Sequence, residues 1–466
     1  MELVAYGAQD IYLTGNPQIT FFKLVYRRHT NFSMESIKQD FSGISSGTMA
    51  EIKGKKTSCT ISRNGDLITK MYLEMQHTIS GYGDFDKEQN RNYDDSTWGT
   101  VTGQHCNTSA LLIDNIELEI GGQLIDRQRG HFMEVWSELT ELNESGTRGS
   151  TRADDKTQIG TKFQNMACMG GTTSLAGTMT AHVPLYFWFC RHPGLALPLI
   201  ALQYHEVKVK LTFTSIAPFQ YTKLEKNNLY VDYIYLDTDE RRRFAQVSHE
   251  YLIEQVQYIR SGGPSSKSEA GDGGKSEHKL NFNHPVKELI WTAYPDIVVG
   301  GARYDDYPER GERQHFQENC QYKLQFNGID RISKRPFSYF TEQQIYDHHT
   351  GVPLGTNYTK RNLFSKNWAA INGASGAVLT SYDGGHGEGR ANHEQIAVYS
   401  FALHPEEHQP SGTCNFSRLD TATLICSDST HNTTYEVNNQ EILDIYAINY
   451  NVLRIMSGMG GLAYSN

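Results

Sequence analysis

The sequence has few cysteines, and none of them has the paired spacing that holds a zinc ion. There are 7, at Cys59, Cys106, Cys168, Cys190, Cys320, Cys414 and Cys426. No Cys-x-x-Cys pair occurs, so neither a zinc knuckle nor a disulfide scaffold is indicated, and we expect reduced thiols. The first residues lack the basic and apolar regions of a signal peptide. No apolar run approaches the roughly 18 residues of a membrane span.

The sequence also lacks an excess of positive charge. Lys and Arg number 43 against 53 Asp and Glu, which gives a formal net charge of −10. The basic residues are scattered along the chain, whereas phosphate neutralisation needs them clustered. We therefore expect no direct, sequence-specific binding of nucleic acid.

What the sequence does have is aromatic residues and glycine in quantity. The chain contains 27 Tyr, 20 Phe and 41 Gly, a mixture that favours strands joined by irregular loops. Apolar and polar residues alternate in segments such as 116–120, 207–213 and 446–452, as in half-buried strands. Helical spacing is confined to short segments, such as the one holding Phe132, Trp136 and Leu139. The fold class is therefore predicted to be all-β.

The chain repeats itself. Ile125-Asp126-Arg127 returns as Ile329-Asp330-Arg331, each after an alternating strand and before an aromatic segment. Pro193, Pro198 and Tyr204 have the same spacing as Pro405, Pro410 and Phe416, and Glu35 and Ile37 match Glu254 and Val256. Matches in the same order, about 210 residues apart, indicate one unit present twice. About eight short strands per unit predict two tandem, eight-stranded antiparallel jelly rolls with short helices and long loops.

These patterns divide the chain into four segments. We expect an N-terminal arm at 1–31, a first jelly roll at 32–238, a linker at 239–249 and a second jelly roll with a C-terminal tail at 250–466. The linker begins with the charged run 239–243, which could instead contact a neighbouring chain.

Residues that could carry chemistry are few. His386, Glu388 and His431 imitate a two-His-one-carboxylate iron site, as in a metal oxygenase. They lie in predicted exposed loops without the rigid support that a ligand set needs, so we expect no metal, no cofactor and no catalytic residue. His404 and His408 flank Glu406 and Glu407, which we interpret as a surface turn.

Sugars could enter in two ways. Asn107, Asn143, Asn357 and Asn432 begin Asn-x-Ser/Thr sequons in predicted loops and are the candidate glycosylation sites. Alternatively, a sugar-binding jelly roll could stack sugars on the aromatic side chains of Trp98, Tyr304 and Tyr307. Glycan binding by the isolated protein would favour that second hypothesis.

Long motifs give the chain a family resemblance. They are YGAQD at 6–10, FFKLVYRRHTNF at 21–32, NHPVKELIW at 283–291, QPSGTCNFSR at 409–418, YAINYNVLR at 446–454 and GMGGLAYSN at 458–466. They resemble the major capsid proteins of nucleocytoplasmic large DNA viruses, especially those of algae and amoebae. The resemblance runs from end to end of the chain.

The resemblance implies a structural protein and not an enzyme. It implies a double jelly roll that forms a homotrimeric, pseudo-hexagonal capsomer, which tiles the facets of an icosahedral shell. Neighbouring capsomers, penton and minor capsid proteins and an internal viral membrane would be its partners. The protein would be found in the virion capsid, after assembly in a virus factory in the host cytoplasm.

The N-terminal arm is too apolar to remain free in such an assembly. Its apolar residues include Ile11, Leu13, Ile19, Phe21 and Phe22. We expect the arm to dock beneath the jelly rolls and to engage neighbours on the inner side of the shell.

Overall fold

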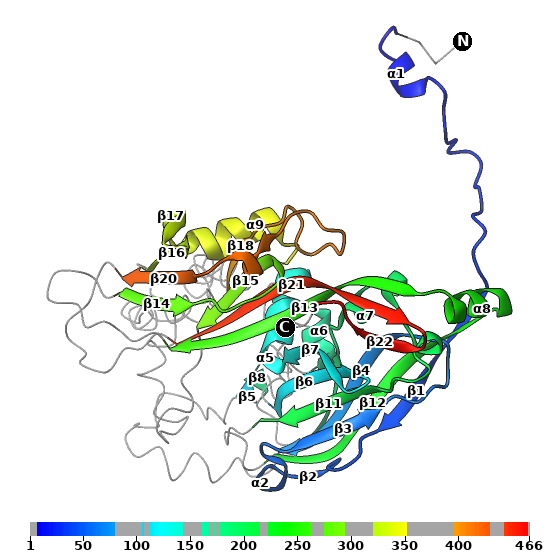
Figure 1. Ribbon diagram of the computed structural model, residues 1–466, viewed down its shortest axis with the longest axis horizontal. Coiled ribbons are helices and arrows are strands. Elements are labelled where there is room, and N and C mark those ends of the chain that lie inside the picture. Colours follow the sequence, from blue (N-terminus) through cyan, green and yellow to red (C-terminus); the bar gives the residue numbers. More distant parts are fainter. Residues whose placement is uncertain are drawn as a thin grey trace, which may run out of the picture.

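The computed structural model describes most of the chain. The described residues are 7–79, 105–106, 112–142, 161–167, 172–173, 177–214, 222–262, 275–293, 320–351, 396–428 and 442–464. They form antiparallel sheets that lie in two groups, one from each half of the sequence (Figure 1).

The first group is a sandwich of two sheets. One sheet has the order β1 (Phe32–Asp40), β12 (Thr222–Leu236), β4 (Leu67–Ile79), with β9 (Gly177–Pro184) and the short β10 (Leu197–Pro198) pairing β4 and β2 (Gly47–Thr48) pairing β12. The other has the order β3 (Lys56–Thr60), β11 (Val207–Phe213), β6 (Ile113–Ile120), β7 (Gln123–Arg129). This is the strand order of a jelly roll, which we call the first roll.

The second group repeats that order. One sheet runs β13 (His249–Gly262), β21 (Ile442–Met456), β15 (Pro285–Ala293), β18 (Ile396–Ser400), with the short β19 (Cys414–Asn415) on β15 and β22 (Met459–Leu462) on β21. The other runs β14 (Lys275–Lys279), β20 (Ala422–Asp428), β16 (Cys320–Phe326), β17 (Ile329–Pro336). This second roll confirms the predicted all-β fold of two tandem jelly rolls. A separate pair joins β5 (His105–Cys106) to β8 (Thr172–Thr173).

Helices are short and connect the strands. They are α1 (Ile11–Thr14), α2 (Met49–Ile52), α5 (Gly130–Thr140), α6 (Lys162–Ala167), α7 (Trp188–Arg191), η1 (Pro193–Leu195), η2 (Leu199–Ala201), α8 (Thr238–Gln246), η5 (Tyr339–Gln343), α9 (Gln344–His348) and η6 (Phe416–Arg418). The helix predicted after the first Ile-Asp-Arg is α5, and its counterpart after the second is the continuous η5–α9.

Alternation of side chains builds the core of each roll. In β11, Val207, Val209 and Leu211 are buried in the first core, while Lys208 and Lys210 point the other way. Lys210 forms an ion pair with Glu119 on the neighbouring β6. Because successive side chains of a strand point to opposite faces, β11 turns one face to the core and the other toward solvent.

We call the end of each roll at which its first strand starts and its tight hairpin turns the base. In the first roll Phe32 pairs with Leu236, so β1 starts where β12 ends. The turn between β6 and β7 lies there too, at Gly121-Gly122 with φ of 57° and 86°. A Cβ on Gly121 would collide with the imidazole ring of His205, so this turn needs glycine both for its backbone and for space.

Two of the repeated motifs do not occupy equivalent positions. Ile329 directly follows the turn of its hairpin and is 74% exposed, whereas Ile125 lies two residues further along and is buried. Ile37 faces the core of its own roll, while Val256 faces outward from its sheet. The duplication is therefore confirmed by strand order, and these residue-by-residue matches are wrong by one or two positions.

The expected linker is largely helical. The side chain of Asp237 accepts a hydrogen bond from the main-chain N–H of Thr238 at the start of α8. The charged run 239–243 lies within α8, and Nε of Arg241 donates to the buried carboxylate of Asp66 at 2.8 Å. This stretch of the linker thus contacts its own first roll.

One histidine in the first core makes stability depend on pH. His77 on β4 is fully buried, and neither ring nitrogen has a hydrogen-bond partner among the residues that the structure describes. Burial lowers the pKa of His77 to about 4. The charged form is disfavoured because the apolar core cannot solvate it.

Acidification should therefore destabilise the protein through His77. An unfolded histidine has a pKa near 6.5, so the unfolded chain binds more protons than the folded chain as pH falls from about 6.5 to about 4. Lowering the pH from 7 to 5 should cost about 2 kcal/mol through this residue. Chemical unfolding of His77→Leu at both pH values should show a smaller loss by that amount. The exposed His29→Gln control should behave like the parent protein, and equal losses in all three would contradict the assignment.

Candidate assembly interface

The two rolls meet through α5. Met133 on this helix packs into the core of the first roll. The opposite side of α5 packs on the outer face of the β13–β21–β15–β18 sheet of the second roll, where the ring centroids of Phe132 and Tyr446 are 5.2 Å apart. The residues of this seam are Phe132, Val135, Trp136, Leu139, Val256, Ile290, Ile345, Val398, Tyr446 and Ile448. The helix α5 thus covers a sheet face that would otherwise be exposed to solvent.

A second contact joins β7 to β13. The carboxylate of the buried Asp126 accepts the main-chain N–H of Val256 at 3.1 Å. Next to it, the amide of Gln255 donates to the carbonyl of Ile125. Burial raises the pKa of Asp126, and its hydrogen bonds oppose that rise. Because β13 is the edge strand of its sheet, these bonds satisfy main-chain groups that an edge leaves open.

The third contact is made at the base by the hairpin of β21 and β22. Main-chain N–H of Tyr204 donates to the carbonyl of Gly458 at 3.0 Å, and N–H of Leu462 donates to Oε1 of Gln123 at 3.2 Å. Nδ1 of His205 lies 2.9 Å from the carbonyl oxygen of Gly460. These hydrogen bonds hold the β21–β22 hairpin of the second roll against the first roll, and most of them use main-chain groups of the hairpin.

A buried ionic cluster lies beside this seam. Arg191 of the first roll donates to Glu254 of the second at 2.6 Å, and Nζ of Lys287 lies 2.8 Å from the same carboxylate. The guanidinium of Arg191 also lies 4.9 Å from the ring centroid of Trp136 on α5. Sequence reasoning missed this cluster, although two charged residues in the apolar run 286–291 were a signal for it.

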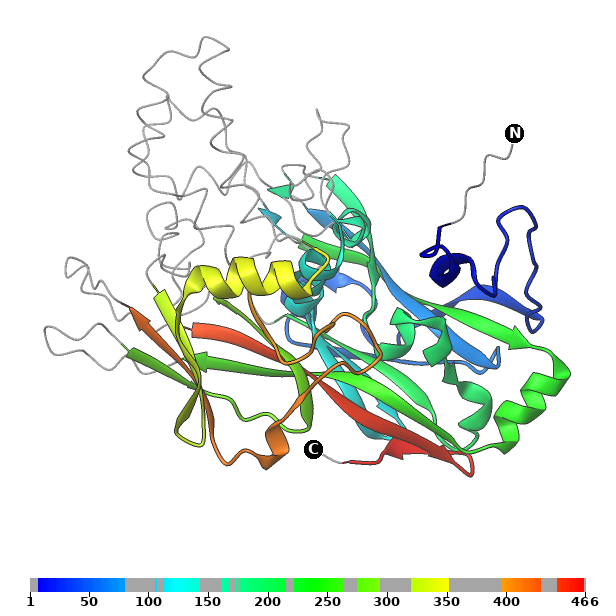
Figure 2. The same cartoon turned by 90° about the horizontal axis from the view of Figure 1, so that it is seen from above.

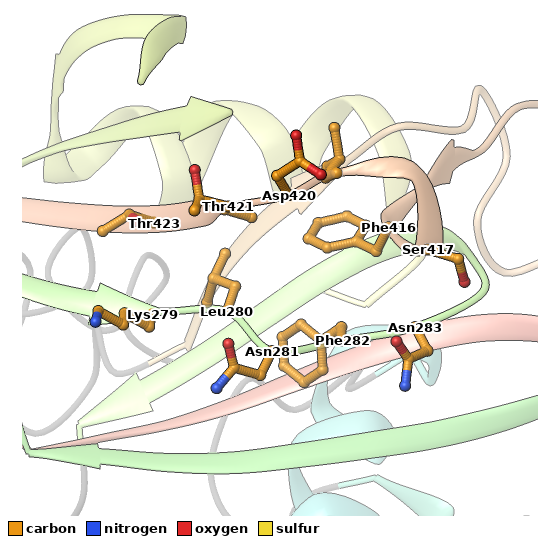
Figure 3. A pocket seen from close by; sticks show the side chains of 12 residues that line it. Lys279, Leu280, Asn281, Phe282, Asn283, Phe416, Ser417, Asp420, Thr421 and Thr423 are labelled. Atoms are coloured by element: carbon orange, nitrogen blue, oxygen red, sulfur yellow. The ribbon is translucent and has the colours of Figure 1, made fainter. Parts of the chain in front are cut away.

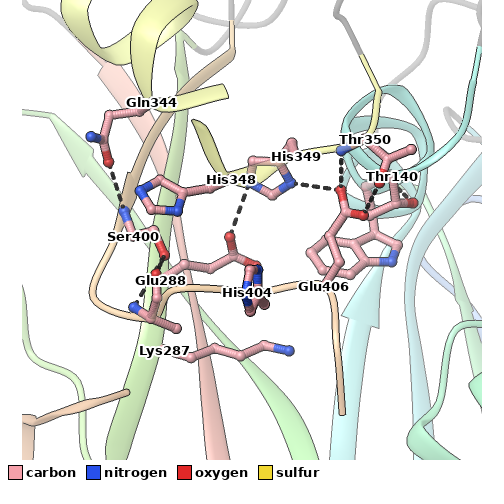
Figure 4. A network of polar contacts seen from close by, with 12 residues as sticks. Thr140, Lys287, Glu288, Gln344, His348, His349, Thr350, Ser400, His404 and Glu406 are labelled. Atoms are coloured by element: carbon pink, nitrogen blue, oxygen red, sulfur yellow. Dashed lines mark hydrogen bonds and ion pairs between the residues drawn. The ribbon is translucent and has the colours of Figure 1, made fainter. Parts of the chain in front are cut away.

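His349 extends the cluster. Its Nε2 lies 3.1 Å from Glu288 and its Nδ1 lies 3.1 Å from Glu406. Figure 4 shows Glu406 bonded to both His349 and Thr350. His408 lies 3.5 Å from Glu254. The segment 404–408 is a surface turn, as predicted, with His404 and Glu407 exposed. The prediction did not include the contacts that Glu406 and His408 make with the cluster.

The charges in the cluster determine which groups are ionised. Burial disfavours ionised Glu254, but His408, Lys287 and Arg191 outweigh burial and lower the pKa of Glu254 to about 2. Burial lowers the pKa of Lys287 against the opposing carboxylates. For His349, burial would lower the pKa, but Glu288 and Glu406 outweigh it and raise the pKa to about 9. Below that pH, His349 therefore carries a positive charge between Glu288 and Glu406.

Alkaline pH should weaken this cluster. Because the pKa of His349 is raised from about 6.5 to about 9, its contribution is complete below about pH 6.5 and is lost as pH rises through 9. Between pH 7 and 10 the loss should be about 2 to 3 kcal/mol. The variant His349→Gln should have a lower free energy of unfolding than the parent protein at pH 7. Unfolding curves of the variant at pH 7 and 10 should not show the further loss. The adjacent His348→Gln should keep it, and a parent protein equally stable at pH 7 and 10 would refute the role of His349.

The counterparts of the seam are largely uncovered, although Ile345 of α9 itself belongs to the seam. The helix η5–α9, yellow in Figure 2, follows β17 as α5 follows β7. Almost every residue of α5 is buried, but η5–α9 exposes Glu342, Gln343, Tyr346 and Asp347, and Tyr346 is 84% exposed. The outer sheet face of the first roll carries half-exposed Tyr72 and Tyr230, whose rings stack at 5.1 Å. Each roll therefore has the elements of the seam, but the chain joins only one set.

The predicted arm residues lie apart from both rolls. Residues 7–31 leave the base beside α8 and extend away from the molecule (Figure 1). Ile11, Leu13, Ile19, Phe21 and Phe22 are between 68% and 99% exposed. Within one chain the arm does not dock beneath the rolls, so its engagement of neighbours stays a prediction.

The other candidate residues lie outside the described residues of the chain. These are Asn107, Asn143, Asn357 and Asn432, then His386, Glu388 and His431, and Trp98, Tyr304 and Tyr307. Among the described residues, no cluster of His, Cys, Asp and Glu could hold a metal ion, and no helix is long and apolar enough to cross a membrane. Cys59, Cys190 and Cys414 are free, but Cys426 is disulfide-bonded, so the expectation of reduced thiols is wrong there.

Known proteins share this architecture and sequence. A family model described as major capsid protein N-terminus matches 20–237, and one described as large eukaryotic DNA virus major capsid protein matches 240–372 and 385–461. The major capsid protein of Pyramimonas orientalis virus is 46% identical, covering 100% of this chain and 99% of its own length. That of Paramecium bursaria Chlorella virus 1 is 38% identical with the same coverage.

A solved structure agrees with these relatives. The quasi-atomic model of the PBCV-1 virus capsid matches with a TM-score of 0.65 and 34% identity, covering 96% of this chain and 100% of that one. The relatives are structural capsid proteins and not enzymes. With 96% of this chain covered, the match includes both rolls. The chain belongs to the family of major capsid proteins of large eukaryotic DNA viruses.

Proposed function

We propose that three copies of the chain form a closed, pseudo-hexagonal capsomer that tiles the facets of an icosahedral shell. The supporting observation is the seam that the chain uses once and leaves open once. Inside the chain, α5 of the first roll covers the outer sheet face of the second roll. Between chains, η5–α9 of one second roll would cover the outer sheet face of the next first roll, around Tyr72 and Tyr230.

The geometry of this repeat leads to a ring. The helix η5–α9 lies on the second roll and the sheet face that it would cover lies on the first roll. Each chain added to the assembly therefore again has one uncovered helix and one uncovered sheet face. A head-to-tail contact of this kind closes into a ring when its rotation permits. Three chains supply six similar rolls, and six similar walls give an almost hexagonal block. Stable subunit contacts of this kind bury more than about 2,000 Å² with an apolar centre.

The segments of the chain take different roles in this capsomer. Residues 32–238 and 250–466 form the two walls, 239–249 connect them, and 1–31 form the arm toward the inner side. Penton and minor capsid proteins would complete the shell around an internal membrane, with assembly in the host cytoplasm. The net charge of −10 supports a shell wall that does not itself bind the genome.

The open seam can be tested by placing a charge in it. Light scattering should give the parent protein a mass of three 52.7 kDa chains. Tyr346→Asp on α9 and Tyr230→Asp on β12 should each weaken association at least about thirtyfold and yield monomers, because a carboxylate would be buried without a partner. Unfolding curves should show both variants still folded.

A matched control separates the seam from general surface change. Tyr12→Asp puts the same substitution on the arm, where the side chain is 89% exposed and outside the seam. It should keep the trimeric mass. A monomeric parent protein would sink the capsomer proposal, and trimeric seam variants would show that the ring closes through other surfaces.

A further inference from the structure

The base of the second roll has an open hollow. It has a volume of about 480 Å³ and lies between the segments 279–283 and 416–423 (Figure 3). Phe282 and Phe416 form its apolar floor, and the side chains of Asn281, Asn283 and Thr421 line it as well. Such a lining suits an extended segment, because the floor takes apolar side chains and the amides and hydroxyl take main-chain groups.

The matching place on the first roll is filled. There η2 corresponds to η6, and the turn between β6 and β7 corresponds to the turn between β16 and β17. The hairpin of β21 and β22 lies over them, bonded to Tyr204, His205 and Gln123. The second roll has no such cover among the described residues: Ile329, which follows its turn as Gln123 follows the other, is 74% exposed.

The duplication indicates which end of a neighbour would reach the hollow. The filling hairpin continues from the strand end where His249 pairs with Ile455. The corresponding strand end of the first roll is where Phe32 pairs with Leu236. The N-terminal arm leaves the chain at that point. If the seam is repeated between copies, the arm and α8 of the next copy therefore emerge at the place that corresponds to the one from which the hairpin reaches the first roll.

The hollow and the arm of one chain lie far from each other. In Figures 1 and 2, β1 and α8 lie toward one end of the molecule and β14 and β20 toward the other. A second copy is therefore the natural source of the arm. The arm has suitable residues. In an extended segment Phe22, Leu24 and Tyr26 would share one face, and each is at least 76% exposed in the single chain.

We propose that residues 20–31 of one copy lie extended across the base hollow of the neighbouring copy's second roll. Phe22, Leu24 and Tyr26 pack toward Phe282, Phe416 and the exposed Ile329, and main-chain groups of the arm bond to the polar lining. The arm then ties adjacent copies together on the inner side of the capsomer. This inference rests on the proposed ring, since only the ring brings the two ends together.

Disulfide trapping tests the contact. The double variant Phe22→Cys with Thr421→Cys should give covalently linked multimers on non-reducing gels of the purified protein under mild oxidation. Phe22→Cys with Gln203→Cys is the matched control, since Gln203 lies on the corresponding loop of the first roll, where the hairpin already sits. It should give no more linkage than Phe22→Cys alone, which measures the background from the native thiols.

A protease readout avoids new cysteines. Arg27 and Arg28 make the arm a trypsin site, and docking should protect it. Ile329→Glu places a charge next to the turn of β16 and β17, where Asn327 accepts the main-chain N–H of Thr421 in the lining of the hollow. It should speed cleavage of the arm at least about tenfold, the factor for a loss of about 1.4 kcal/mol in docking, while the mass stays trimeric.

The mass of each sample separates the two proposals. Monomers would contradict the ring itself. Trimers without linkage, with linkage only inside one chain, or with equally fast cleavage in parent and variant would overturn the arm contact and leave the ring standing. Linkage to α8 through Asp239→Cys in place of Phe22→Cys would assign the hollow to that helix of the neighbour instead.

Discussion

The structure depends on the cover that one roll gives to the other. A sheet buries one face in its own core and leaves the other to water unless something covers it. In the second roll that outer face carries Val256, Ile290, Tyr446 and Ile448, which are all buried by α5. This apolar contact fixes the rolls side by side, and the edge contact at Asp126 and the base hairpin then set their register.

The ionic cluster beside the seam adds specificity more than stability. Taking Glu254, Lys287 and Arg191 out of water is costly, and their mutual attraction offsets that cost only in the correct geometry. A displaced first roll would leave a buried carboxylate and ammonium without the guanidinium of Arg191. Misplaced arrangements of the two rolls are therefore penalised strongly, while the correct one gains little. This penalty gives a physical reason for charges in the otherwise apolar strand β15.

Much of the fold could be predicted from the sequence because it depends on local periodicity. Alternation in 207–213 and 446–452 predicted strands, and the spacing of Phe132, Trp136 and Leu139 predicted α5. The repeat predicted two rolls, although the exact residue pairs were shifted because Ile-Asp-Arg follows the turn of the second hairpin two residues sooner than it follows the turn of the first. The cluster around His349 was missed, since its members come from segments that only the folded chain brings together. Spacing alone also gave no sign that α5 faces a second roll.

The covalent link between the rolls changes how a ring of this kind would grow. In a closed trimer, half of the six roll-to-roll joints are made within chains, where the effective concentration of the partner is high and no translational freedom is lost. The second chain to bind makes one contact between chains, and the third makes two at once. Ring closure is therefore steep in protein concentration, and incomplete pairs are the least populated species. In such a ring, joining two similar rolls through α8 would mean that three molecules meet where six would otherwise have to, with few intermediates to misassemble.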